Sequence, residues 1–244
     1  MSEDITEYGY NQKERMYPDF IKEAQAAYKE SGDPVLGRFL SKKQGEYRVE
    51  DYYALPETCR VELIDGVIYN MAAPTNLHQA IITEIAVQLD TWMRRKKGKC
   101  MVMISPADVQ LDQDDKTMVQ PDIFVCCAKE NQKEGRDKRK RSEKKVYRAF
   151  QGAPDLVVEV LSFSSRKRDR VTKYRKYREA GVREYWIVDP ETRRITVHLL
   201  ERGEETVVYT YQDEIPVHIY QGECRITLAD MEQKEELMAD LGLV

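Results

Sequence analysis

The sequence predicts an α/β fold in which a mixed central β-sheet is flanked by helices and preceded by an N-terminal helical arm. Its apolar patterns follow one another as a hairpin, a helix, three strands, a second helix and further strands, an order typical of a sheet that helices cover. The run LVVEVL at 156–161 is apolar on both faces of a strand, as in sheets covered on both sides. The chain has 244 residues, enough for one large domain with an appended arm.

Residues 1–45 form the predicted arm, and residues 46–244 form the predicted domain. The arm carries a short helix at 18–30 and, after the helix-breaking SGDP, a second short helix at 34–43. The first residues are acidic and polar without an apolar core, so they do not resemble a secretory signal. No apolar run approaches the ~20 residues of a membrane span. We therefore expect a cytoplasmic protein that does not enter a membrane.

Five cysteines are spread along the chain without a C-x-x-C pair. Cys126 and Cys127 lie in an apolar, strand-like run. An odd number of cysteines without metal-ligand spacing favours reduced, buried thiols over a zinc site or a disulfide framework.

The predicted domain opens with a hairpin and a long helix. VELIDGVIYNM (61–71) has apolar stretches on both sides of Asp65-Gly66, a pair that tolerates the positive φ of a tight turn. Residues 76–98 carry apolar side chains at helical spacing, and basic residues and Gly98 end the pattern. The spaced apolar residues are Ile81, Ile82, Ile85, Leu89 and Trp92.

Strands make up most of the remaining domain. We expect strands at 100–111, 119–127, 154–162, 183–189, 192–201 and 205–211, with a short segment near 215–220 that finishes the sheet. A helix at about 165–180 ends at Gly181, and a terminal helix covers 229–241. The sequence has neither G-x-G-x-x-G nor G-x-x-x-x-G-K, so no loop that cradles nucleotide phosphates is expected. None of the three histidines lies in a nucleophile motif.

Two segments are strongly basic, although the net charge of the chain is −4. Residues 129–148 carry ten Lys or Arg and four Asp or Glu, and residues 166–178 carry eight Lys or Arg and one Asp. Such segments can bind a polyanion, or they can be solvated surface. We favour a solvated loop insertion for 129–148 and a phosphate-binding helix for 166–178, because the second segment follows a strand that contains a glutamate.

Carboxylates inside apolar strands are the informative feature of this sequence. Asp122 lies in QPDIFV and Glu159 in LVVEVL. A buried charge costs several kcal/mol unless it is paired or binds a metal. Mg²⁺ takes oxygen ligands, often one or two carboxylates with waters and phosphate. We expect Asp122 and Glu159 to meet across the sheet at such an ion, although a strand-start Asp122 and a salt-bridged Glu159 would explain each residue singly.

Asp155 forms a second Pro-Asp pair just before Glu159. Four residues along a strand span about 13 Å at ~3.3 Å each. Asp155 and Glu159 therefore cannot share one ion while both lie in a regular strand.

Lys173 lies on the predicted helix that follows this strand. Asp169, Lys173 and Tyr177 are spaced i, i+4 and i+8, so they share one helix face. Lys173 can reach back toward the carboxylates to hold a scissile phosphate or orient a water. The alternative is an ordinary surface pair between Asp169 and Lys173.

A series of motifs in this chain resembles the Uma2 (Uma-two) family of proposed restriction endonucleases, within the PD-(D/E)XK nuclease superfamily. The matching motifs are Pro121-Asp122, E-V-L-S (159–162), D-x-x-x-K-x-x-x-Y (169–177), G-V-x-E-Y-W-I-V-D-P (181–190) and, upstream, V-E-L-I-D-G-V-I-Y-N-M (61–71) with P-x-x-x-H (74–78). The resemblance covers roughly residues 46–200.

The resemblance implies a restriction-endonuclease-like core and Mg²⁺-dependent hydrolysis of phosphodiester bonds, with Mn²⁺ as a substitute ion. Asp122 and Glu159 would bind the metal, helped by the backbone carbonyl of Val160. The ion would activate a bound water and stabilise charge on the phosphate.

One position departs from the superfamily pattern, because Leu161 stands where E-x-K places lysine. The resemblance implies that Lys173 on the following helix replaces it, with Lys176 as a second candidate. Glu62 and His78 also match family positions and can complete the site. Alternatively, Glu62 is a surface charge of the hairpin and His78 a structural residue at a helix start.

We therefore expect a metal-dependent endonuclease that acts on DNA, with a homodimer as a possible assembly. A catalytically weak or inactive module that binds nucleic acid or a partner on the same fold is the alternative. A structural or regulatory protein whose basic segments bind an acidic partner is a third possibility.

Overall fold

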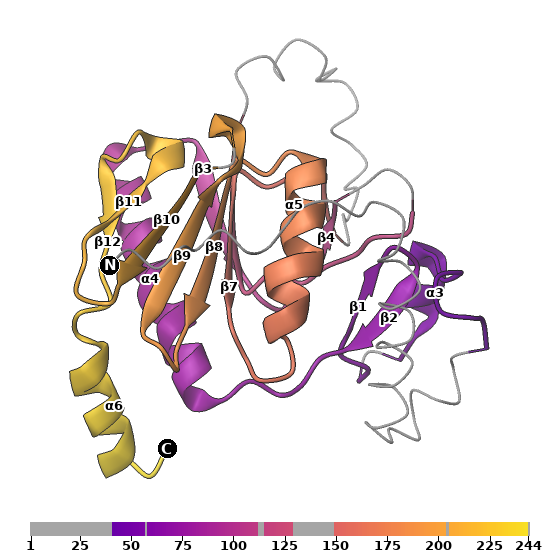
Figure 1. The fold of residues 1–244 in the computed structure, drawn as a ribbon, viewed down its shortest axis with the longest axis horizontal. Coiled ribbons are helices and arrows are strands. Elements are labelled where there is room, and N and C mark those ends of the chain that lie inside the picture. The colour runs from indigo at the N-terminus through magenta and orange to yellow at the C-terminus, as the bar shows by residue number, and fades with distance from the viewer. Residues whose placement is uncertain (1–40, 57, 112–114, 129–148, 204, 244) are drawn as a thin grey trace, which may run out of the picture.

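The computed structural model describes residues 41–56, 58–111, 115–128, 149–203 and 205–243. Its centre is a six-stranded sheet in the order β10-β9-β8-β7-β5-β3 (Figure 1). The strands are β3 (Cys100–Ile104), β5 (Ile123–Cys127), β7 (Leu156–Val160), β8 (Glu184–Asp189), β9 (Arg194–Leu199) and β10 (Glu205–Thr210). Only β7 and β8 pair in parallel within this sheet, so the fold is α/β with a mixed central sheet, as predicted.

Helices cover both faces of the sheet. The long helix α4 (Asn76–Lys96) packs on one face, and α5 (Tyr174–Ala180) packs on the other (Figure 1). Side chains alternate between the two faces along each strand. In β7, Leu156, Val158 and Val160 pack with α4, whereas Val157 packs with α5. By the same alternation, Glu159 projects toward α5.

The helix α4 forms where the sequence predicts it. Its buried residues are Ile81, Ile82, Ile85, Leu89 and Met93. The side chain of Thr75 caps its first turn by accepting a hydrogen bond from the backbone N–H of His78. Three basic residues occupy its last turn, where they interact favourably with the helix dipole.

The segment that follows β7 is a helix with an unusual first part. Residues Arg168–Lys173 (η3) form a π-helix, which continues directly into α5. Gly181, with φ 91°, ends α5 in the left-handed region. The predicted helix and its end are therefore confirmed. Short π-helical segments occur often at functional sites.

A smaller unit lies beside the α5 face of the sheet. It contains α3 (Val49–Ala54), the hairpin of β1 (Val61–Ile64) and β2 (Val67–Asn70), and the parallel pair of β4 (Val109–Gln110) and β6 (Phe150–Gln151). The hairpin turn is Asp65-Gly66, with φ values of 51° and 75°, as its sequence predicts. Gly66 also lies close to the backbone of Gly45. The sequence does not predict α3 or β6, and the single strand expected at 100–111 is divided into β3 and β4.

The C-terminal strands differ from the prediction. The elements are β11 (Ile215–Val217), η5 (His218–Tyr220), β12 (Cys224–Ile226) and α6 (Met231–Asp240), with the short turn η4 (Leu200–Arg202) before β10. The β11 strand pairs with β12 in a separate two-stranded sheet instead of finishing the main one. Its apolar residues pack against α4, on the same side of the main sheet.

The expectation of reduced thiols is wrong for two cysteines. Cys100 and Cys127 form a disulfide between β3 and β5, while Cys59, Cys126 and Cys224 are free. The two residues are direct partners in the antiparallel register of these strands. The sequence could not show this register, because it depends on how strands far apart in the chain pair.

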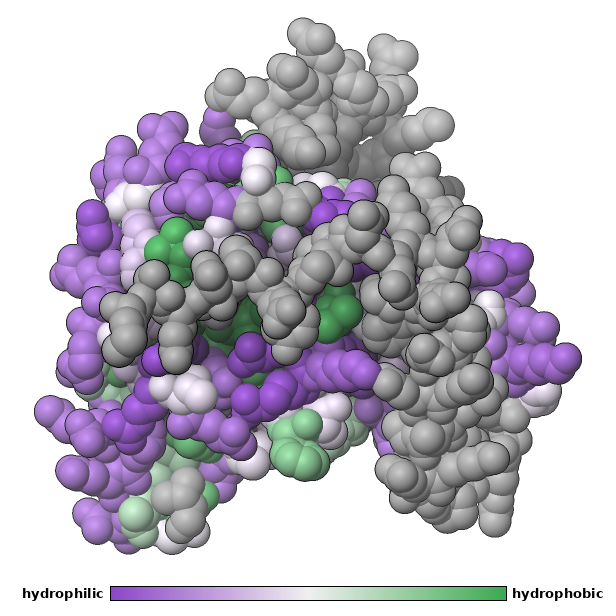
Figure 2. Space-filling model, viewed as in Figure 1, coloured by the Kyte–Doolittle hydropathy of each residue, from purple (hydrophilic) through white to green (hydrophobic). Residues whose placement is uncertain are grey.

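The helices expected at 18–30 and 34–43 and the basic insertion at 129–148 lie outside the described residues, except for 41–43. No helix in the described part of the chain is long and apolar enough to cross a membrane. The coloured surface in Figure 2 is mostly hydrophilic, with hydrophobic residues in small separate groups.

Candidate functional site

Glu159 lies between the sheet and the helix that follows it. Its side chain is 4% exposed. The Oε1 atom accepts hydrogen bonds from Lys173 Nζ at 2.9 Å and from the hydroxyl of Tyr177 at 2.6 Å. The predicted helix face that carries Lys173 and Tyr177 therefore points at this carboxylate.

Lys173 is the buried centre of a cluster of carboxylates. Its Nζ atom lies 2.7 Å from Glu62 Oε1, 2.9 Å from Glu159 Oε1 and 3.5 Å from Asp169 Oδ1. Burial alone would lower the pKa of Lys173, but the charges of Glu159, Glu62 and Asp169 outweigh it and raise this pKa above its usual value. Lys173 is therefore a permanent cation that holds three acidic side chains together.

Glu62 is a member of this cluster and not a surface charge of the hairpin. It lies on β1 and its side chain is 0% exposed. Oε1 also accepts a hydrogen bond from the backbone N–H of Gln120 at 3.0 Å. Oε2 lies 3.4 Å from Arg168 Nε, although neither atom makes a hydrogen bond within the described residues.

Two carboxylates of the cluster, Glu159 and Asp169, resist ionisation. Burial raises the pKa of Glu159 well above its ordinary value, and the charges of Asp169, Asp122 and Glu62 raise it further, while Lys173 opposes them. Burial also raises the pKa of Asp169, again against Lys173. Binding of a further cation, or of a proton, would therefore stabilise these two buried carboxylates.

Asp122 meets His78 and Val160 at the edge of the same cluster. Asp122 Oδ2 accepts a hydrogen bond from the backbone N–H of Val160 at 2.8 Å. His78 Nε2 lies 2.9 Å from the carbonyl oxygen of Val160 and 3.3 Å from Asp122 Oδ2. Burial would lower the pKa of His78, but the hydrogen bond and charge of Asp122 outweigh burial and raise it.

The strand register explains why Asp122 approaches Glu159. Ile123 pairs with Val158 in the antiparallel β5–β7 ladder, which places Asp122, one residue earlier, beside Glu159. Asp155 is engaged elsewhere, as expected. It accepts a hydrogen bond from the backbone N–H of Cys127 at 2.7 Å and pairs with Arg183 at 3.2 Å.

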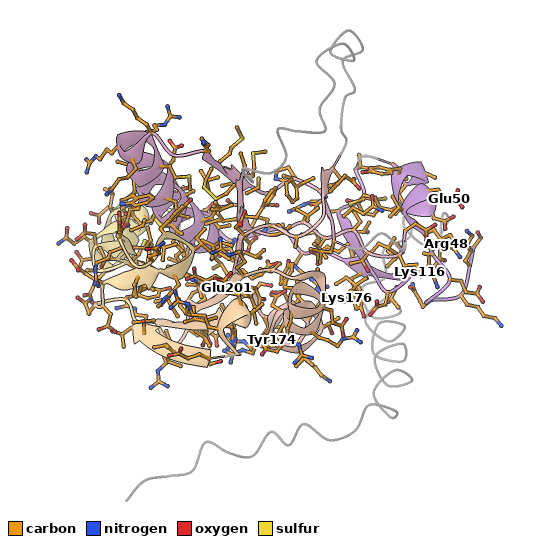
Figure 3. All side chains as sticks on the ribbon, turned by 90° about the horizontal axis from the view of Figure 1, so that it is seen from above. Arg48, Glu50, Lys116, Tyr174, Lys176 and Glu201 are labelled. Atoms are coloured by element: carbon orange, nitrogen blue, oxygen red, sulfur yellow. A yellow bond between two sulfur atoms is a disulfide. The ribbon has the colours of Figure 1, made fainter. Side chains whose placement is uncertain are left out.

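Leu161 stands at the position where the E-x-K pattern has lysine, and it supplies no charge there. It is 4% exposed and packs in the core beneath α5. The ammonium beside Glu159 comes instead from Lys173, as the sequence predicts. The second candidate, Lys176, is bound to Asp65 of the hairpin turn at 2.8 Å. In Figure 3, Tyr174 and Lys176 lie on different sides of α5, with Lys176 nearer the hairpin.

Local carboxylates neutralise much of the basic segment. Asp189, whose side chain is 4% exposed, binds Arg166 and Arg170 at 2.9 Å each. Further pairs join Arg166 to Glu191, Arg168 to Glu62, and both Arg175 and Lys176 to Asp65. A large share of this segment's charge therefore stabilises the fold, which weakens the prediction that the helix serves mainly to contact phosphate.

Two contacts of the site were not predicted from sequence. The first is the bond from Tyr177 to Glu159, which the D-x-x-x-K-x-x-x-Y spacing could have indicated. The second is the hydroxyl of Tyr185, which donates to the backbone oxygen of Asp169 at 3.0 Å. Tyr185 lies on β8, and its ring lies 4.9 Å from that of Tyr177, centroid to centroid, in a tilted arrangement, so the two tyrosines pack the helix against the sheet.

Comparisons with known proteins agree with this fold and these motifs. A family model described as "Uma2: Putative restriction endonuclease" matches residues 49–229. No curated protein matches the chain. A crystal structure of "a putative nuclease belonging to DUF820" from Anabaena variabilis ATCC 29413 has a TM-score of 0.60 and 20% sequence identity, and the match covers 76% of this chain and 97% of that one.

The similarity to the solved structure shows a shared fold and nothing more, because only 20% of the aligned residues are identical. The family match is stronger, because its residues 49–229 include β1, α4, β5, β7 and the helix that carries Lys173. The chain therefore belongs to the Uma2 family.

Proposed function

We propose that this protein is a metal-dependent endonuclease that hydrolyses phosphodiester bonds in DNA, with Mg²⁺ as its ion and Mn²⁺ as a substitute. The observation that supports this most is the register of β5 and β7, which places Asp122 beside Glu159 and lets the backbone N–H of Val160 donate to Asp122 Oδ2. Membership of the Uma2 family agrees with it. Buried carboxylates without enough cationic partners are suited to a divalent ion.

The residues present fit such an ion. Within the described ranges, no group of three or more His, Cys, Asp or Glu side chains is arranged to hold a metal. Mg²⁺ does not require one, since it is commonly bound through one or two carboxylates, with waters and substrate phosphate completing its shell. Asp122, Glu159 and the backbone oxygen of Val160 would supply the protein ligands.

Two of these oxygen donors lie close to one side-chain atom, His78 Nε2. The Val160 oxygen and Asp122 Oδ2 lie 2.9 Å and 3.3 Å from His78 Nε2. An atom at this position can therefore contact the Val160 carbonyl oxygen and Asp122 Oδ2 at the same time.

Each side chain has a distinct role in the proposed reaction. A bound ion would lower the pKa of a water and stabilise charge on the phosphate. Lys173 lowers the pKa of Glu159 and fixes its Oε1 atom, and Tyr177 fixes the same oxygen. Lys173 is thus a positioning residue for Glu159, because its ammonium is already engaged by three carboxylates.

Cleavage of plasmid DNA and of short oligonucleotides tests this proposal. We expect cleavage in Mg²⁺ or Mn²⁺, none in EDTA, and none by Asp122→Asn or Glu159→Gln. Asp90→Asn is a suitable control, since Asp90 is a surface carboxylate that pairs with Arg94 on α4. Thermal unfolding confirms that each variant is folded. Full activity of either site variant would rule the proposal out.

A non-catalytic module that binds nucleic acid is the second candidate function. The burial of Leu161 and the full engagement of Lys173 favour it, since neither can contact a phosphate as found. DNA binding that weakens with salt and persists unchanged in EDTA, without cleavage in any metal, would support this candidate against the first.

A further inference from the structure

Phe163 is the most exposed of the large hydrophobic side chains in the described part of the chain. It is 94% exposed, compared with 63% for Met101 and for Leu241. Phenylalanine is usually buried, since burying its ring contributes about 1.5–3 kcal/mol. The fold of this chain gains almost none of that contribution from Phe163.

The backbone that presents Phe163 is fixed. The backbone N–H of Ser165 donates to Ser162 Oγ at 3.2 Å, and the N–H of Ser162 donates to Ser165 Oγ at 3.1 Å. The N–H of Arg166 also donates to the carbonyl of Ser162 at 3.1 Å. This reciprocal pair has the bonding pattern of a capping box, with Ser165 in place of the usual Glu or Gln. Phe163 therefore lies in an anchored turn that leads into the helix beginning at Arg166.

Phe163 also lies close to the proposed metal site. It is three residues beyond Val160, so the two Cα atoms are at most about 11 Å apart. Along one DNA strand, that distance corresponds to about three nucleotides at 3.4 Å each. Lys167, four residues later, is exposed and adds positive charge to the same segment. An exposed ring with a nearby cation suits a stacked base beside its phosphate.

We propose that Phe163 stacks on a nucleobase within about three nucleotides of the scissile phosphate, and that the substrate is DNA with accessible bases. This inference rests on the proposed nuclease function. Bases in an intact duplex are already stacked on each other, so Phe163 could reach one only after costly unstacking. Single-stranded DNA, or duplex DNA with an unpaired region, offers a free base face without that cost.

Binding of fluorescently labelled oligonucleotides tests the inference without requiring cleavage. Dissociation constants are measured for single-stranded and duplex DNA in the Glu159→Gln background, with Mg²⁺ and with EDTA. Phe163→Ala and Phe163→Leu should bind the single strand about 5- to 150-fold more weakly, whereas Phe163→Trp should bind it as well as Phe163. Met101→Ala, an exposed apolar residue on β3, is the matched control and should change nothing.

Removal of single bases identifies the stacked nucleotide. An abasic site at one position should weaken binding by the same factor as Phe163→Ala, and the two changes together should give no further loss. Two results would overturn the inference. The first is that Phe163→Leu binds single-stranded DNA as tightly as the unchanged protein. The second is that the abasic site and Phe163→Ala together weaken binding by the product of their separate factors. A change of oligomeric state in Phe163→Ala without a change in binding would instead show that a second copy covers the ring.

Failure of this inference is distinguishable from failure of the nuclease proposal. Metal-dependent cleavage with no Phe163-dependent binding contradicts the stacking alone. Phe163-dependent binding without cleavage in any metal contradicts the nuclease proposal alone. If the unchanged protein binds no DNA, the stacking is overturned directly.

Discussion

Lys173 Nζ lies 2.9 Å from Glu159 Oε1, and the two side chains are 3% and 4% exposed. The bond joins the central strand β7 to the helix that follows it. It places a cation beside the strand glutamate although Leu161, two residues after Glu159, is part of the core. The helix thus supplies the charge that the strand itself lacks.

Replacing Lys173 with methionine should be strongly destabilising. The change keeps the length of the side chain but leaves Glu62, Glu159 and Asp169 without their shared cation, a loss of about 3–5 kcal/mol. Because the pKa of Lys173 is raised in the folded state, its contribution is complete below its ordinary value of 10.5 and is lost only at higher pH. Urea denaturation at pH 8 measures the loss.

The same variant should be less affected at pH 5. As the pH falls, carboxylates whose pKa is raised, such as Glu159 and Asp169, take up protons, so fewer uncompensated charges remain. Lys167→Met, an exposed position on the same segment, should cost little at either pH. An equal loss for both variants would contradict the central place of Lys173.

Lys176 should not be needed for DNA cleavage. It is bound to Asp65, which Arg175 also binds at 2.5 Å. Lys176→Met should therefore cost about 1–3 kcal/mol of stability while the folded protein keeps its cleavage rate. Single-turnover cleavage assays at saturating protein check this. Loss of activity in a folded Lys176→Met protein would show that Lys176 takes part in the reaction and would contradict this prediction.

His198 should make the fold less stable in mild acid. Burial, helped by the charge of Arg170, lowers the pKa of His198 to about 4. The unfolded chain, with the ordinary value of 6.5, then binds more protons between these values, so stability is complete above 6.5 and falls as the pH drops toward 4. Between pH 7.5 and pH 5 the loss should be about 1–2 kcal/mol.

His198→Gln isolates this effect, because glutamine can still hydrogen bond to Thr206, the partner of His198 Nδ1 at 2.9 Å. Chemical denaturation of both proteins at the two pH values gives the comparison. The pH-dependent loss should shrink in the variant. An unchanged loss would assign the acid sensitivity to other groups.

The disulfide between Cys100 and Cys127 should stabilise the oxidised protein. It closes a loop whose ends are 27 residues apart, and loops of that length correspond to about 2–4 kcal/mol. Thiol titration under denaturing conditions should find three free cysteines before reduction and five afterwards. Melting temperatures with and without reductant measure the stabilisation.

Cys126→Ala serves as the control for the disulfide, since Cys126 is next to Cys127 but free. Its melting temperature should fall on reduction as much as that of the unchanged protein. Cys100→Ser should show no further fall on reduction. If Cys100→Ser melts at the same temperature as the oxidised protein, the bridge contributes nothing.

Periodic patterns made much of the fold predictable from the sequence. The apolar spacing along 76–98 and the Asp65-Gly66 turn depend on local geometry, and both elements are found. The placement of Lys173 and Tyr177 on one helix face was predictable for the same reason. Local sequence thus indicated which helix face carries the site.

Features that depend on distant pairing were not predictable. The β11–β12 sheet and the disulfide follow from strand registers that no local pattern encodes. The burial of Glu62 follows from packing of the hairpin against the helix, which also pairs Arg175 with Asp65. The sequence shows the positive charge of residues 166–178. It does not show that Asp189 neutralises part of this charge.

A crystal soaked in Mn²⁺ tests the central claim most directly, because the anomalous signal locates the ion independently of activity. We predict one peak in contact with Asp122, Glu159 and the carbonyl oxygen of Val160, with Lys173 still bound to Glu159. The peak should disappear in Asp122→Asn crystals grown and soaked in the same way. No peak at these three residues in the unchanged protein, at Mn²⁺ concentrations that support cleavage, would contradict the metal site proposed for this protein.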